Sequence, residues 1–172
     1  MVKIVDNFLS EQEVMKIKSV VYDKLFAWYW FDDVSYHKDH PHYNYVNNNL
    51  FYMCHILYEA PAYFTKQYQP IAEVFQNKFD LKCVLRVKAN CYPKSDKVEE
   101  HGMHQDYTYK HNGVLYSLNT CDGYTKFESG EKIDSVKNRA IFFDPSVPHT
   151  STNTTNAKKS ISCRKFNHHI FS

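Results

Sequence analysis

A chain of 172 residues has the length of one domain and is long enough to bury a core without disulfides or structural metals. Its 43% hydrophobic and 23% charged residues exclude a disordered or fibrous protein, and no apolar run approaches the length of a membrane-spanning helix. The first residues hold no long apolar stretch, so we expect no secretory signal and no membrane partner. The net charge of +2 gives no electrostatic reason to expect nucleic acid as a partner.

Two features of the composition are informative about fold and compartment. Aromatic residues reach 16%, with 14 Tyr and 12 Phe, and such side chains favour half-buried strands. The five cysteines are odd in number and contain no Cys-x-x-Cys pair, which argues against a disulfide framework or a thiolate zinc site. We therefore expect a reducing compartment and a cytoplasmic protein.

The first predicted elements are a short edge strand over 2–5 and a helix that begins after Ser10. Ser10 and Glu13 have the spacing of a capping box, in which each side chain satisfies a backbone N–H of the other residue. An apolar stripe at helical spacing follows, made of Val14, Ile17, Val21 and Leu25. We therefore predict an amphipathic helix here.

The middle of the chain is less regular. Residues 28–49 are rich in aromatic residues, His and Asn, and they predict a loop or a short ladder. Pro61 and Pro70 each suit a first helical turn, so we expect two helical pieces between Ala60 and Phe79.

From Lys82 the apolar period changes to two, which predicts a strand. Its two faces carry Cys83, Leu85, Val87, Ala89 and Cys91 on one side, and Arg86, Lys88, Asn90 and Tyr92 on the other. Further strands are predicted over 114–119, 124–127, 140–143 and 160–166, with Gly, Pro and Asp-Gly turns between them. This order predicts one mainly β domain over 1–172. Helices in 1–80 would support an antiparallel jelly-roll core in 81–172 and pack on one of its sheets.

Metal ligands are predicted in the sequence His104-Gln105-Asp106. In an extended segment the first and third side chains point to the same side, so His104 and Asp106 converge while Gln105 turns away. His149, which follows an apolar strand and a proline turn, is the candidate for the third ligand. Two histidines and a carboxylate form the facial triad that holds Fe(II) and leaves other positions open. Taken alone, His149 is equally well explained as an ordinary surface histidine.

A second His-x-Asp sequence occurs at His37 and Asp39. It lies in a polar stretch that ends at Pro41, with no predicted strand to present it. We interpret this copy as a loop without a metal role.

Two further residues are candidates for binding an anionic cosubstrate. Lys159 opens the last predicted strand, ten residues after His149, where a cation could pair with a carboxylate. Tyr92 ends the alternating strand on its polar face, where a phenol could hydrogen-bond the same group. An ordinary solvated turn around Lys159 and a structural tyrosine at position 92 remain open alternatives.

Taken together, these pieces resemble the Fe(II)- and 2-oxoglutarate-dependent oxygenases, in the branch of the prolyl 4-hydroxylases and their small bacterial and phage members. The motifs that carry the resemblance are Lys88-Ala89-Asn90-Cys91-Tyr92-Pro93, the run from His101 to Asp106, Tyr116-Ser117-Leu118-Asn119, Gly123 to Phe127, Pro148-His149, and Lys159 to Arg164. They cover about half of the chain. One departure is that Lys159 stands where most hydroxylases of this class have Arg, with Lys158 and Arg164 as rivals for its role.

The resemblance implies a double-stranded β-helix and a set of site residues. His104, Asp106 and His149 would hold Fe(II), while Lys159 and Tyr92 would bind the far carboxylate of 2-oxoglutarate. The cosubstrates would be 2-oxoglutarate and O2, with ascorbate as a further reductant, and the compartment would be the cytoplasm of a bacterium or of a phage-infected cell. The expected substrate-lining residues are Lys88, Asn90, Tyr107 and Tyr116, with Trp28, Tyr29, Trp30 and Tyr109 as candidates for an entrance. The preference for iron over manganese or zinc also rests on the resemblance.

Three functions remain open from the sequence. The first is a peptidyl hydroxylase of the prolyl type, favoured by the closest motifs and by the carboxylate of Asp106, which relatives that halogenate lack. The second is an oxygenase of a small metabolite or a nucleobase. The third is a jelly-roll binding or capsid-associated protein without catalysis.

Overall fold

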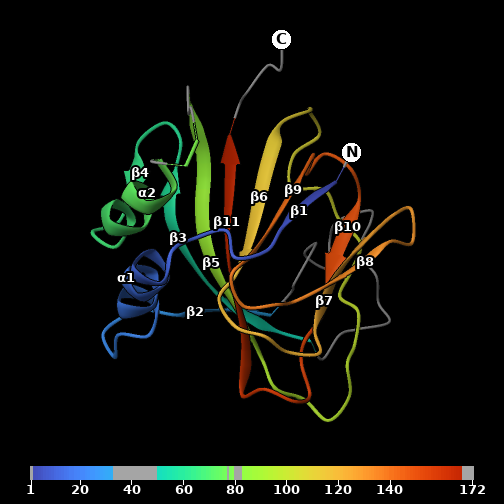
Figure 1. Ribbon diagram of the computed structural model, residues 1–172. Coiled ribbons are helices and arrows are strands. Elements are labelled where there is room, and N and C mark those ends of the chain that lie inside the picture. Colours follow the sequence, from blue (N-terminus) through green and yellow to red (C-terminus); the bar gives the residue numbers. More distant parts are fainter. Residues whose placement is uncertain (1, 33–49, 77, 80–82, 168–172) are drawn as a thin grey trace.

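The computed structural model describes residues 2–32, 50–76, 78–79 and 83–167, with only the backbone described over 163–167. Its strands form a large and a small sheet in which all strand pairs are antiparallel (Figure 1). The large sheet has the order β1 (Lys3–Val5), β9 (Arg139–Phe143), β6 (Asn112–Ser117), β11 (Lys159–Asn167), β5 (Val84–Pro93), β3 (Tyr52–Glu59) and β2 (Tyr29–Phe31), and β4 (Tyr63–Phe64) pairs with β3. The small sheet has the order β10 (His149–Ser151), β7 (Tyr124–Phe127) and β8 (Lys132–Asp134). The predicted mainly β, antiparallel fold is confirmed.

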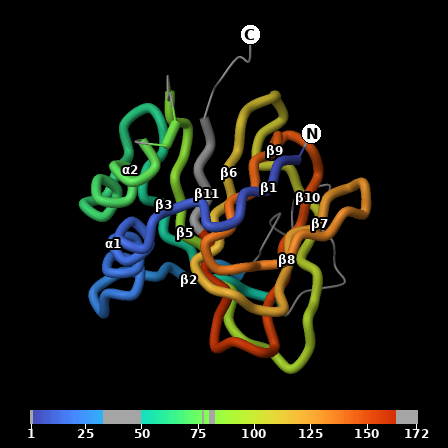
Figure 2. Tube along the Cα trace, viewed as in Figure 1, coloured from blue at the N-terminus to red at the C-terminus, as the bar shows by residue number. Residues whose placement is uncertain are grey.

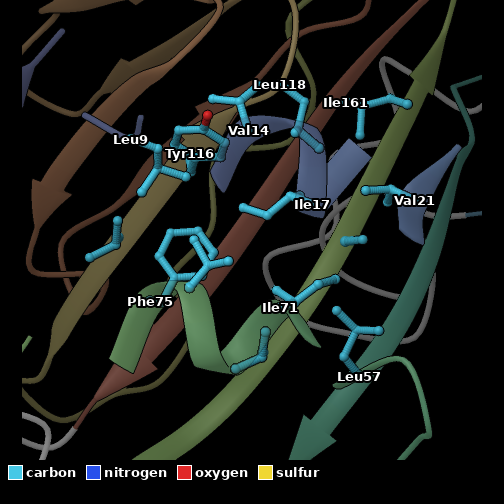
Figure 3. Close-up of a cluster of buried hydrophobic side chains, with 14 of the residues drawn as sticks. Leu9, Val14, Ile17, Val21, Leu57, Ile71, Phe75, Tyr116, Leu118 and Ile161 are labelled. Atoms are coloured by element: carbon cyan, nitrogen blue, oxygen red, sulfur yellow. The ribbon is translucent and has the colours of Figure 1, made fainter. Parts of the chain in front are cut away.

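Two helices cover one face of the large sheet, α1 (Glu11–Val21) and α2 (Tyr68–Gln76). The predicted capping box begins α1: Ser10 Oγ accepts from the backbone N–H of Glu13, whose carboxylate accepts from the backbone N–H of Ser10. The apolar sides of both helices meet the sheet in the main core (Figure 3). The residues that Figure 3 labels come from α1 (Val14, Ile17 and Val21), from α2 (Ile71 and Phe75), and from the sheet and its connections (Leu9, Leu57, Tyr116, Leu118 and Ile161). This is the helix-side core.

The other face of the large sheet is turned toward the small sheet, so the sandwich has an interior of its own. Along the chain trace, α1 and α2 lie on one side of the large sheet, and β7, β8 and β10 lie on the other (Figure 2). Apolar side chains of both sheets meet in this interior: Leu115, Ile141 and Phe143 pack with Phe127 and Ile133. Both faces of the large sheet are therefore buried over its central strands.

The side chains of strand β5 alternate between the two faces of the large sheet. Val87, Ala89 and Cys91 lie in the helix-side core, as the period of two requires. Asn90 and Tyr92, from the opposite face, are also buried. The polar side chains of this strand therefore line the interior of the sandwich, where they can reach the predicted ligands.

Several elements differ from the prediction. Leu25 is exposed because α1 ends at Val21, before the stripe is complete. The chain forms a turn with a cis peptide bond at Pro61 and then the short strand β4, so α2 is the one helix described between Ala60 and Phe79. Strands β1 to β4 all lie within the first 80 residues, so this part of the chain is not only helical.

No helix among the described residues is both long and apolar enough to cross a membrane. The sequence His37-x-Asp39 lies outside the described residues.

Candidate metal centre

The three predicted ligands come together in the structure. One ligand atom from each of His104, Asp106 and His149 lies within 4.8 Å of the other two. His104 precedes β6 in a segment without regular strands, and this segment runs beside β10. The backbone N–H groups of His104 and His149 each donate to the other residue's carbonyl at 2.9 Å. This pair of hydrogen bonds joins two parts of the chain that are 45 residues apart.

Both imidazole rings are oriented by backbone carbonyls. Nδ1 of His149 lies 2.9 Å from the carbonyl oxygen of Val147, and Nδ1 of His104 lies 3.0 Å from that of Gly102. A carbonyl oxygen can only accept, so each Nδ1 carries a hydrogen, which in a neutral ring leaves the lone pair on Nε2. A metal-binding histidine needs this tautomer when Nε2 is the ligand atom. His149 is fully buried, which excludes the alternative of a surface histidine.

Asp106 presents its two oxygens to different groups. Oδ1 accepts from the Arg86 guanidinium at 2.9 Å, and the Lys88 ammonium lies 3.8 Å from the same oxygen. Oδ2 faces His149 and lies 3.4 Å from its Nε2. The Asp106 side chain is 3% exposed, so its charge is balanced by these cations rather than by bulk water. Gln105 is exposed and donates to the carbonyl of Ser146, as the alternation predicted.

Arg86 is a site residue that the sequence analysis did not single out, although it stands on the polar face of the predicted strand. Its guanidinium lies 5.0 Å from the ring centroid of Tyr107 and 3.9 Å from Glu59 Oε1. Tyr107 stacks in turn on Tyr109, and burial raises the pKa of the Tyr107 phenol. The structure thus brings Lys88 and Tyr107, both expected to line the site, close to Asp106.

Tyr92 and Asn90 lie further along the same face of β5. Tyr92 stacks between Tyr52 and His101, with ring centroids 5.6 Å and 5.0 Å away. Asn90 Nδ2 donates to the Tyr92 hydroxyl at 3.3 Å, and His101 Nδ1 lies 2.9 Å from Ser151 Oγ in β10. The phenol is therefore buried between the two sheets, on the side of β5 that carries Lys88.

Lys159 does not point to this site. Its ammonium lies 5.0 Å from the ring centroid of Tyr22, at the end of α1, and it is close enough to influence the Cys91 thiol. Burial raises the pKa of Cys91 to about 11, and the positive charge of Lys159 opposes that shift. Lys159 and Ile161 are two residues apart in β11 and so share a face of the strand. Ile161 packs in the helix-side core, so the Lys159 side chain is also directed away from the interior of the sandwich. The prediction that Lys159 faces the site is wrong for this reason.

The rivals of Lys159 have different positions. Lys158 is exposed just before β11 begins. The backbone of Arg164 lies in register between Lys88 of β5 and Leu115 of β6.

Tyr116 was expected to line the substrate site, but the structure places it on the opposite face of the large sheet. Its side chain is fully buried in the helix-side core, and its hydroxyl donates to Asn138 Oδ1 at 3.0 Å. Its neighbour Leu115 packs in the interior of the sandwich instead. Of the aromatic residues proposed for an entrance, Trp28 packs on Phe26, whereas the side chains of Tyr29 and Trp30 are exposed on the edge strand β2.

No protein-family model matches the chain, and no curated protein matches it. Several solved structures, in contrast, match the fold of the chain. A prolyl hydroxylase from Trichoplax adhaerens, in complex with a hypoxia-inducible factor peptide fragment, matches with a TM-score of 0.63 and 12% identity over 96% of this chain and 83% of that chain. An oxidoreductase of the 2-oxoglutarate–Fe(II) oxygenase family from Burkholderia pseudomallei matches with a TM-score of 0.60 and 11% identity over 98% of this chain and 86% of that one.

A smaller viral protein aligns along almost its whole length. It is the viral collagen prolyl hydroxylase from Paramecium bursaria Chlorella virus 1, with a TM-score of 0.55 and 13% identity over 96% of this chain and 94% of that chain. The chain has the fold of the 2-oxoglutarate–Fe(II) oxygenases. At these identities the likeness establishes the architecture, and the chemistry has to be argued from the residues in the site.

Proposed function

We propose that this protein is an Fe(II)- and 2-oxoglutarate-dependent dioxygenase that hydroxylates an unactivated C–H bond in a peptide, as a prolyl-type hydroxylase. The observation that carries the proposal is the convergence of His104, Asp106 and His149 in this fold, with His149 fully buried and the other two residues partly buried. Two neutral imidazoles and one carboxylate are a donor set that suits Fe(II) and leaves coordination positions open for other ligands. The residues present therefore fit the metal that the fold implies.

Each residue has a definable task in this proposal. Iron and 2-oxoglutarate, when bound, would supply the oxidation of the C–H bond by O2, coupled to conversion of the cosubstrate to succinate and CO2. His104 and His149 would hold the metal through Nε2, because the carbonyls of Gly102 and Val147 fix their Nδ1 hydrogens. Arg86 would hold Asp106 by Oδ1 and so turn Oδ2 toward the metal. Tyr92 would donate a hydrogen bond to a carboxylate of the cosubstrate.

The peptide substrate is inferred from what similar structures act on. The neighbour from Trichoplax adhaerens is a prolyl hydroxylase in complex with a peptide fragment, and the viral neighbour is a collagen prolyl hydroxylase. The choice of iron over manganese or zinc is inferred from the neighbour from Burkholderia pseudomallei, an oxidoreductase of the 2-oxoglutarate–Fe(II) oxygenase family, since the ligand types alone permit all three metals. Incubation with iron, ascorbate, 2-oxoglutarate and a peptide library should give a peptide heavier by one oxygen atom, detected by mass spectrometry. If only small metabolites or nucleobases gain oxygen, the peptidyl proposal is wrong.

The metal assignment is tested by Asp106→Ala. We expect this variant to fold but to lose at least a hundredfold in succinate formation, measured with iron, ascorbate and 2-oxoglutarate alone, because two histidines are a poor chelate for Fe(II). Asp39→Ala, in the other His-x-Asp sequence, is the matched control and should retain normal turnover. Normal succinate release from Asp106→Ala would refute the assignment, and loss in Asp39→Ala alone would move the metal to the first motif.

A further inference from the structure

His55 is a buried titratable side chain that the candidate metal centre does not use. It lies on β3 and is only 2% exposed. Its partner across the β3–β5 ladder, Ala89, packs in the helix-side core, so the imidazole lies on the face of the large sheet that is turned away from the metal ligands. Neither ring nitrogen forms a hydrogen bond with the described residues. Such a position favours the neutral ring, because a buried charge without a partner is costly.

Aromatic rings from the chain that leads into β2, and from β2 itself, cover this imidazole. The ring centroid of Phe26 lies 4.6 Å from that of His55, and the ring of Tyr29 makes an edge-on contact at 5.5 Å. Phe26 is buried in the helix-side core, whereas Tyr29 is 54% exposed. One half-exposed ring at the edge of the sheet therefore separates the imidazole from water on this side.

The groups around His55 supply no counter-ion for a charged ring. The titratable group on β2 is the phenol of Tyr29, and the one on the same face of β5 is the Cys91 thiol, which stays protonated because burial raises its pKa to about 11. Burial lowers the pKa of His55, the Ala27 carbonyl opposes this shift, and no charged side chain of the described residues contributes to it. The charged residues in the connection between α1 and β2 are exposed: Asp23 and Lys24.

Strand β2 is the element next to His55 that can separate most easily from the sheet. It has three residues, all with exposed side chains, and it stands last in the order of the described strands of the large sheet. Short elements with little buried surface open at a low cost in free energy. Phe31 of β2 packs on Tyr52 at 5.3 Å, and Tyr52 stacks on Tyr92 between the two sheets. Separation of β2 would therefore remove one support of the aromatic residues in the interior.

We propose that His55 is a pH-sensitive switch that keeps β2 on the large sheet while its ring is neutral and releases the strand when the ring takes up a proton. The charged imidazole would reach water only if Phe26 and Tyr29 move away, so proton uptake and separation of the strand are coupled. Because the closed arrangement lowers the pKa of His55, its stability is complete above the ordinary value of 6.5 and falls as the pH drops below that value. The inference does not depend on the proposed function.

Hydrogen exchange measured by mass spectrometry on the intact protein tests the switch. Labelling at about pH 7.5 and about pH 5.5, with times corrected for the intrinsic pH dependence of exchange, compares the neutral and the protonated ring. In wild type, opening of residues 26–31 and of the facing residues 52–54 should increase up to about tenfold at the lower pH. His55→Leu, which has a similar volume and no titratable group, should abolish this increase. His55→Gln serves in the same way if His55→Leu does not fold.

The peptides over β7 and β8 are the internal control, because they lie in the other sheet and should keep their protection at both pH values. An increase of equal size in His55→Leu would overturn the inference, since the proton would then act on another group. Unchanged protection of β2 in wild type would overturn it as well. Equal loss of protection in β2, β7 and β8 would mean that acid loosens the whole fold, which contradicts a local release.

Discussion

The two carboxylate oxygens of Asp106 have different partners, because Arg86 binds only one of them. With Oδ1 bound to the guanidinium at 2.9 Å, Oδ2 is the oxygen that remains for a metal beside His149. A carboxylate held in this way would bind a metal through one oxygen and leave more coordination positions open for other ligands. The cation–π contact with Tyr107 fixes Arg86 from the other side.

Tyr116 provides a test of which face of β6 is functional. Tyr116→Phe should lower the free energy of unfolding by about 1 kcal/mol, because the hydrogen bond to Asn138 is lost in a buried position. Binding of 2-oxoglutarate should be unaffected, since the ring lies in the helix-side core. Urea unfolding measures the first effect, and isothermal titration of 2-oxoglutarate into the manganese-loaded protein measures the second, with Tyr63→Phe on the exposed strand β4 as the control. Unchanged stability with weakened binding would restore Tyr116 as a residue of the site.

At the scale of elements, the segment that carries His104 and Asp106 is attached to the small sheet at its start. Glu100 accepts from Lys126 at 2.7 Å and from the Tyr124 hydroxyl at 2.8 Å, both in β7, and lies 3.2 Å from Lys132 in β8. Beyond Glu100, the His101 N–H donates to the carbonyl of Ser151 in β10. The segment from Glu100 to Asp106 is therefore held by ion pairs and by a few backbone hydrogen bonds to neighbouring strands.

The attachment through Glu100 should make stability depend on pH. Hydrogen bonds from Lys126 and then Tyr124 lower the pKa of Glu100 to about 2, from an ordinary value of 4.5. Because the folded pKa is the lower one, the stabilisation is present above pH 4.5 and is lost as the pH falls toward 2. The Glu100 side chain is one-third exposed, so we expect a contribution of only about 1 kcal/mol.

Urea unfolding of wild type and Glu100→Gln at neutral and acidic pH measures this contribution. The difference between the two proteins should be present at neutral pH and largely vanish near pH 2, the folded-state pKa. Glu131→Gln, in the exposed turn between β7 and β8, should show no such difference. A gap between wild type and Glu100→Gln that stays constant with pH would contradict the assignment.

At the scale of the whole molecule, the candidate metal centre connects segments that only the folded chain brings together. The unfolded chain has no such site, so a bound divalent ion should stabilise the folded state by mass action. At a free manganese concentration a hundred times the dissociation constant, the gain should be about 2.7 kcal/mol. Thermal unfolding should show a higher Tm with manganese, a reversal on adding EDTA, and no shift in Asp106→Ala. An equal rise of Tm in Asp106→Ala would mean that the metal binds elsewhere.

Features that depend on neighbours in the chain were predictable. The convergence of His104 and Asp106 was expected from the side-chain alternation of an extended segment, although no regular strand forms there. The two faces of β5 follow from the strand period, and the capping box at Ser10 is a local exchange of hydrogen bonds. Strand β3 was missed although it pairs with β5 along most of its length. The side chains of β3 are buried or partly buried on both faces of the sheet, so its sequence lacks the alternation of apolar and polar residues that marks a half-exposed strand.

The sequence by itself determined which side chains share a face, because that depends only on the geometry of an extended chain. It could not determine which face is the interior of the site, since both faces of β5 and β11 are covered, one by helices and one by the small sheet. The packing of helices on one face and the small sheet on the other places the Lys159 ammonium over the Tyr22 ring and the Lys88 ammonium near Asp106. The tertiary structure alone also decided that His149 meets His104, because the hydrogen bonds that join them link distant segments through packing of the whole sandwich.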